Sequence, residues 1–181
     1  MDTSTLNDLI DRCKQKDEKA FRPIVESYQT MIYSVAFRVL CNVEEAKDIV
    51  QETFLRVWMN LAKFQKEKKF STWIYAIATN LCLDKLKSTK NQSNNHTINE
   101  SIIELISHEN PEQKLINSEL AEIIMTLTNE LTPKQKVVFT LRYLEELEVE
   151  EIMQITGLSS QKIKSNLFLA RQTIRQKLEK Y

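Results

Sequence analysis

Apolar residues recur every three or four positions through most of this chain, which is the spacing that places them on one face of an α-helix. In the first half these stripes run from Phe21 to Val35, from Ala46 to Leu61 and from Phe70 to Leu81. We expect a short leading helix near Leu6 to Cys13 to pack against these three amphipathic helices. Ser71 or Thr72 is the expected start signal of the third. The pattern predicts a first helical domain over residues 1–87.

The second half repeats the helical pattern after a polar interval. Asn and Ser dominate the early part of residues 88–110, which we interpret as a flexible linker. Asn110 and Pro111 then form an expected helix start, and Thr132-Pro133 forms another. The stripes of this half run from Leu120 to Leu131, from Val137 to Leu144 and from Ile163 to Leu178, with a short helix over Glu150 to Thr156. The predicted architecture is therefore all-α, with a second small domain over residues 111–181.

Composition supports helices and narrows the class of protein. The chain contains one glycine and three prolines, the two main helix breakers, and 42% apolar residues. No run reaches the roughly 18 apolar residues of a membrane span, and Met1 to Ile10 lacks the pattern of a secretion signal. Cys13, Cys41 and Cys82 are odd in number and form no CxxC pair. We expect a soluble cytoplasmic protein whose cysteines are packing residues, with no metal site and no cofactor.

The charges are segregated although the formal net charge is zero. From Ser159 to the C-terminus six basic residues accompany one acidic residue, whereas five glutamates crowd into positions 145–151. A second basic cluster surrounds Glu67 and consists of Lys63, Lys66, Lys68 and Lys69. Such clusters are typical of surfaces that contact nucleic acid.

The single glycine lies between the short helix and the long final helix. A short helix, a turn with Gly157 and a helix capped by Ser159 or Ser160 form the helix-turn-helix pattern. The second helix of such a motif lies in the major groove. The residues that we predict to face the bases are Ser160, Gln161, Lys162, Ser165 and Asn166, and those that supply phosphate contacts are Lys164, Arg171 and Arg175. The alternative is a helical hairpin with an ordinary solvated face.

Several motifs together resemble one known family. They are DIVQETFLRVW at residues 48–58, FSTWIYAIATN at 70–80, LTP at 131–133, LRY at 141–143 and GLS at 157–159. In this order they are similar to the two domains of extracytoplasmic-function (ECF) sigma factors. The resemblance implies a non-enzymatic protein that binds RNA polymerase core enzyme, recognises and melts promoter DNA, and is sequestered by an anti-sigma factor. Glu146 stands where the family often has glycine, and Leu169 where it often has arginine.

The predicted helix that carries the stripe from Ala46 to Leu61 presents a mixed acidic and apolar face. With Val50, Phe54 and Val57 turned inward, the opposite face carries Asp48, Gln51, Glu52, Leu55 and Met59. Outward apolar residues beside acids suit a protein partner, and the resemblance implies that this partner is the clamp of the polymerase. The alternative is that Leu55 and Met59 complete an extended core.

The basic cluster at 63–69 precedes an aromatic helix start. Lysines can follow a phosphate backbone, aromatic rings can stack on unpaired bases, and an amide can bond a base edge. We therefore predict DNA contacts by the four lysines, Trp73 and Asn80, and the resemblance implies recognition of a flipped base in the minus-ten element. The alternative is that Phe70 and Trp73 belong to the core.

Two rival functions remain open. A stand-alone helix-turn-helix regulator would bind its operator without polymerase, using the first domain for dimerisation or sensing. An all-helical enzyme lacks support, because a chain with one glycine has no glycine-rich phosphate loop and its histidines, His96 and His108, fall in the polar stretch. The predicted linker could reach roughly 75 Å when extended, at about 3.3 Å per residue, which is enough to connect two promoter elements.

Overall fold

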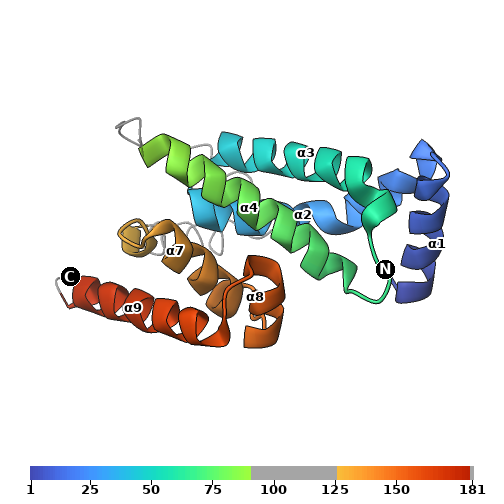
Figure 1. The fold of residues 1–181 in the computed structure, drawn as a ribbon. Coiled ribbons are helices and arrows are strands. Elements are labelled where there is room, and N and C mark those ends of the chain that lie inside the picture. The colour runs from blue at the N-terminus through green and yellow to red at the C-terminus, as the bar shows by residue number, and fades with distance from the viewer. Residues whose placement is uncertain (91–125, 180–181) are drawn as a thin grey trace, which may run out of the picture.

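The computed structural model describes residues 1–90 and 126–179, and every regular element within these ranges is a helix (Figure 1). The first range contains α1 (Thr3–Lys14), α2 (Phe21–Leu40), α3 (Val43–Asn60) and α4 (Phe70–Lys90), with single 3-10 turns η1 (Glu18–Ala20) and η2 (Leu61–Lys63) between them. The second contains α7 (Pro133–Phe139), the π-helical turn η3 (Thr140–Leu144), α8 (Val149–Thr156) and α9 (Ser160–Leu178). The all-helical class is confirmed.

Local sequence signals explain most helix starts. The Asn42 side chain accepts a hydrogen bond from the Glu45 amide and begins α3. Thr132, the residue before Pro133, forms a capping box with Gln135, so the predicted helix start at Thr132-Pro133 is confirmed. The start signal proposed at Ser71 or Thr72 is wrong, because α4 already begins at Phe70 and Thr72 is buried within its first turn.

The core of the first unit, residues 1–90, follows the predicted stripes with local shifts. Val35, Ala46 and Val57 are fully buried as expected. Phe21, Tyr28, Met31, Val50 and Ile77 are only half-buried, because they lie at the edges of their helix faces while neighbouring residues take the centre. Core positions outside the predicted stripes include Ile32, Ile49 and Ala78, and Cys82 is buried as expected of a packing cysteine. Helix α4 continues to Lys90 and so enters the segment that the sequence predicts as linker.

The second unit, residues 126–179, forms a compact helical cluster around α9. Val137, Val138 and Leu141 are buried on α7 and η3, and Leu127 and Leu131 precede them as predicted core residues. The predicted positions Asn110, Pro111, Leu120, Ile123 and Ile124 lie outside the described residues.

The two units pack against each other along α4. This helix contacts α2 and α3 on one side and α7 and α8 on the other (Figure 1). Their buried side chains join one apolar cluster, to which Ile74 contributes from the first unit and Ile152 from the second. In this arrangement two units that are separated in sequence share a core.

None of the described helices combines the length and apolar character that crossing a membrane requires.

Candidate nucleic-acid and protein interfaces

The turn between α8 and α9 has the geometry of a helix-turn-helix motif. Gly157 ends α8 in the left-handed conformation, at φ 68° and ψ 8°, and its amide donates to the Met153 carbonyl at 2.9 Å. The Ser159 hydroxyl accepts a hydrogen bond from the Lys162 amide and begins α9. Ile152 and Ile163 are fully buried where the two helices meet. The sequence therefore located both the glycine and the cap of this motif.

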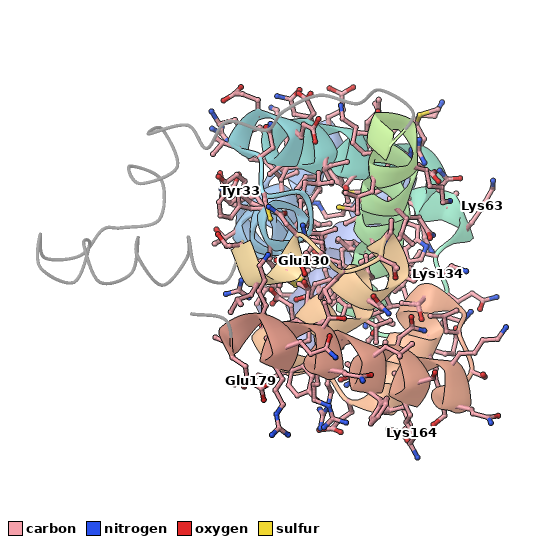
Figure 2. The ribbon with its side chains drawn as sticks, turned by 90° about the vertical axis from the view of Figure 1, so that its left-hand side faces the viewer. Tyr33, Lys63, Glu130, Lys134, Lys164 and Glu179 are labelled. Atoms are coloured by element: carbon pink, nitrogen blue, oxygen red, sulfur yellow. The ribbon has the colours of Figure 1, made fainter. Side chains whose placement is uncertain are left out.

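Burial sets the rotation of α9 about its own axis. Ile163, Leu167 and Ala170 face the core, so the opposite face of the helix is open to solvent. Six predicted DNA-contact residues of α9 are exposed in this structure: Gln161, Lys162, Lys164, Ser165, Arg171 and Arg175. Figure 2 shows the side chain of Lys164 projecting from α9 away from the body of the molecule.

The two remaining predicted residues of α9 are less accessible. Ser160 and Asn166 are half-buried. The Asn166 side-chain amide donates one hydrogen to the Lys162 carbonyl at 2.7 Å, which leaves its second N–H and its carbonyl oxygen available to a base edge. Arg175 donates to Glu179 at 3.0 Å on the surface. An exposed pair of this kind contributes little stability, so the guanidinium can exchange its partner for a phosphate.

The exposed face of α9 also carries two large apolar side chains that the predicted site does not include. Phe168 is 60% exposed and Leu169 is 43% exposed. Both interrupt the polar face that the sequence predicts for this helix. This pair of apolar residues on an otherwise polar face is the sequence signal that could have added them to the predicted site.

The second basic cluster occupies the segment between η2 and α4. All four lysines are exposed, and Figure 2 shows Lys63 pointing away from the body of the molecule. Lys66 pairs with Asp11 at 2.5 Å and Lys69 pairs with Glu151 of α8 at 2.8 Å. The hydrogen bond from Lys69 also lowers the pKa of the Glu151 carboxyl. This last pair connects a predicted DNA contact of the first unit to the helix-turn-helix of the second.

The aromatic residues next to this cluster divide between core and surface. Phe70 is buried, with its ring centroid 5.0 Å from that of Phe64 and 5.4 Å from that of Tyr28. The core alternative is therefore correct for Phe70. Trp73 is half-buried against Phe64 at 5.1 Å, and Asn80 is exposed. Because seven residues make about two helical turns, Trp73 and Asn80 lie along the same side of α4.

Helix α3 presents the predicted mixed face. Asp48 and Gln51 are exposed, and Leu55 and Met59 are exposed by 54% and 71%. Glu52 is half-buried and accepts a hydrogen bond from Arg56 at 2.7 Å. The alternative that Leu55 and Met59 complete a core does not hold in this structure. In Figure 1 this helix lies along the edge of the molecule opposite α9.

Two of the three cysteines, Cys13 and Cys82, are buried packing residues. Burial raises the pKa of the Cys13 thiol to about 11 and that of the Cys82 thiol to about 12. Cys41 is half-buried, and its sulfur accepts a hydrogen bond from Lys136 at 3.3 Å. Within residues 1–90 and 126–179 no group of side chains could hold a metal ion.

Comparisons with known proteins agree with these features. Residues 24–92 match the family model of Sigma-70 region 2, and residues 121–174 match that of Sigma-70, region 4. The chain is 33% identical over 178 residues to the ECF RNA polymerase sigma factor SigW of Bacillus subtilis, covering 93% of this chain and 94% of that protein. It is 30% identical to the ECF RNA polymerase sigma-E factor of Haemophilus influenzae, covering 94% of each.

Solved structures show the same fold at lower sequence identity. CnrH, in complex with the cytosolic domain of CnrY, superposes with a TM-score of 0.69 at 18% identity and covers 98% of both chains. The sigma factor RpoE of Bartonella quintana, in complex with the anti-sigma factor NepR, gives a TM-score of 0.69 at 17% identity. The match covers 89% of this chain and 98% of that one.

Proposed function

Because the chain belongs to the ECF RNA polymerase sigma factors, we propose that it binds RNA polymerase core enzyme and positions it on promoter DNA. It directs transcription initiation. The main support for the proposal is the orientation of α9, the second helix of the helix-turn-helix motif. Its buried stripe faces the core, so its polar and basic residues are exposed to solvent. Bond making belongs to the polymerase, and we assign no catalytic residue to this chain. We propose that it acts in the cytoplasm, where RNA polymerase meets the chromosome.

We assign polymerase binding to α3 and divide promoter recognition between the two units. The N-terminal domain, residues 1–87, would dock through Asp48, Glu52 and the apolar pair Leu55 and Met59. The same domain would contact the minus-ten element through its basic cluster, Trp73 and Asn80. The C-terminal domain, residues 111–181, would contact the minus-thirty-five element through α9.

This division requires the two units to separate. Two promoter elements two helical turns apart lie on the order of 70 Å from each other, whereas α4 and α8 are in direct contact here. The Lys69–Glu151 pair would have to break, which frees Lys69 for a phosphate. The structural relatives in complexes with anti-sigma factors support a partner of that class for this chain as well.

The decisive experiment is run-off transcription by purified core polymerase with and without the chain. We expect transcripts from selected promoters only when the chain is present. Asp48→Lys with Glu52→Lys should abolish core binding, because losing a desolvated charged contact costs about 2–5 kcal/mol. Glu26→Lys with Asp84→Lys is the matched control, since it makes the same charge change at exposed sites away from this face.

The competing function gives a different result in the same assay. A stand-alone regulator would bind a specific DNA site tightly without core enzyme, and the α3 variant would leave that binding intact. Sequence-specific binding that does not depend on polymerase would overturn the proposal.

A further inference from the structure

We propose that Phe168 and Leu169 contact thymine methyl groups in the major groove, so that the chain reads its upstream promoter element partly through apolar contacts. This inference rests on the proposed function, in which α9 enters the major groove. It gives a role in DNA recognition to two exposed residues whose side chains cannot form hydrogen bonds with bases.

The position of the pair on α9 is set by the buried stripe. Ile163, Leu167 and Ala170 are at most 7% exposed and define the inner side of the helix. At about 100° per residue, Phe168 and Leu169 lie on either side of the line directly opposite that stripe. Ser165, which is exposed, lies between them one turn earlier.

Each apolar residue continues a row that begins with a predicted base-contact residue. Phe168 lies seven residues after Gln161, and Leu169 lies seven residues after Lys162, so each pair is about two turns apart on one side of the helix. A helix placed in the groove by Gln161 and Lys162 therefore brings Phe168 and Leu169 to the groove as well.

The charges around the pair identify DNA as the occupant. Lys162, Lys164, Arg171 and Arg175 are all exposed, and residues 160–175 contain no acidic residue. An apolar pair framed by cations alone fits a surface that is apolar at its centre and anionic at its edges. The major groove of DNA has that form, because its floor carries thymine methyl groups and its walls carry phosphates.

The chemistry of the side chains determines which base they can distinguish. Phe168 and Leu169 have no donor or acceptor, so they cannot read the nitrogen and oxygen pattern of a base edge. Among the four bases only thymine presents a methyl group in the major groove. Burying one methyl group contributes about 0.8 kcal/mol, which corresponds to about a four-fold change in affinity at 1.36 kcal/mol per tenfold.

The test uses holoenzyme assembled from core polymerase and the full chain. A promoter library randomised at the minus-thirty-five element first yields the preferred sequence. Each thymine of that sequence, on either strand, is then replaced singly by deoxyuridine, which removes only the methyl group. We expect wild-type holoenzyme to bind at least one uracil promoter about four-fold more weakly.

Variants of the pair complete a double-mutant cycle. Leu169→Ala and Phe168→Ala should weaken binding to the thymine promoter and show no further loss on the uracil promoter that each residue contacts. Leu178→Ala is the matched control, because Leu178 is also an exposed apolar residue of α9 but lies at its C-terminal end. It should keep the full sensitivity to uracil. Leu169→Asn, a polar change of similar size at an exposed site, repeats the measurement should either alanine variant misfold.

The outcomes separate this inference from the function beneath it. Wild-type holoenzyme that selects a minus-thirty-five sequence but binds all uracil promoters normally would overturn the methyl contact and leave the proposed function standing. Uracil sensitivity that survives in Leu169→Ala, Leu169→Asn and Phe168→Ala would also overturn it. Failure of the chain to support any promoter-specific transcription would instead refute the proposed function.

Discussion

Arg38 of α2 and Glu145, directly after η3, form an ion pair with 2.5 Å between the guanidinium nitrogen and the carboxylate oxygen. Arg38 also donates to the Leu144 carbonyl at 2.7 Å, and the Tyr75 hydroxyl donates to the other Glu145 oxygen at 2.8 Å. The Glu145 side chain is only 10% exposed. Helices α2 and α4 of the first unit thus hold one carboxylate of the second.

Removing this carboxylate should destabilise the packed arrangement. Glu145→Ala leaves the Tyr75 hydroxyl without its acceptor and the Arg38 guanidinium without its carboxylate, so we expect the free energy of unfolding to fall by about 2–3 kcal/mol. Urea denaturation followed by circular dichroism measures the change. Glu26→Ala removes an exposed carboxylate from an i,i+4 pair and should change stability by less than about 0.5 kcal/mol. Equal losses for both variants would contradict the structural role of Glu145.

Gly157 should tolerate a side chain sterically but not conformationally. A Cβ at this position meets no atom within 4 Å, yet the residue has φ 68°. We expect Gly157→Ala to cost about 1 kcal/mol because alanine is strained in the left-handed region. Gly157→Asn should cost less, since asparagine tolerates that conformation. Thermal unfolding of the three proteins gives the order, and an alanine variant as stable as the parent would contradict it.

Glu146 presents the reverse case. It has φ 56° without being glycine, so Glu146→Gly should relieve strain and raise stability by roughly 0.5–1 kcal/mol. The same thermal measurement tests this. Glu150→Gly is the control, because Glu150 lies in the first turn of α8 and glycine should there lower stability.

Tyr75 should make the protein sensitive to alkali. Burial, reinforced by the charge of Glu145, raises the pKa of its hydroxyl above the ordinary value of 10.0. The folded state therefore keeps this proton while the unfolded state releases it. The stabilisation is complete below pH 10 and is lost as the pH rises further, at up to about 1.4 kcal/mol per pH unit.

The matching variant isolates this contribution. Tyr75→Phe should be less stable at pH 8, because it lacks the hydrogen bond to Glu145, but its stability should fall less steeply above pH 10. The thiols of Cys13 and Cys82 and the hydroxyls of Tyr28 and Tyr33 also have raised pKa values, and we expect them to contribute equally to both slopes. Identical slopes would contradict the assignment.

The three thiols should differ in their reaction with a soluble disulfide reagent. Cys41 is half-buried, whereas Cys13 and Cys82 are buried at 5% and 0% exposure. We expect one thiol per chain to react quickly under native conditions and all three to react in denaturant. Cys41→Ala should remove the fast phase, and Cys13→Ala should leave it unchanged. A fast phase that persists in Cys41→Ala would contradict this placement.

Features that depend on near neighbours in the chain could be read from the sequence. The capping box of Thr132 and Gln135, the turn at Gly157 and the buried stripe of α9 from Ile163 to Ala170 each involve residues within one or two helical turns. The prediction that this stripe continues to Leu178 is wrong, because Leu178 is 52% exposed. For the same reason the outward positions of Gln161 and Lys162, and of Leu55 on α3, followed from helical periodicity alone.

Only the tertiary structure decided which residues meet across the two units. Arg38 and Glu145 are 107 residues apart, and neither lies in a pattern that indicates its partner. Lys136 reads as a solvated residue of a helix, yet it is 5% exposed, with its ammonium group bound to Cys41 and to Asn129. Periodicity decides which side of a helix turns inward, but the packing of α4 against α7 and α8 decides which polar groups lose water and must find a partner.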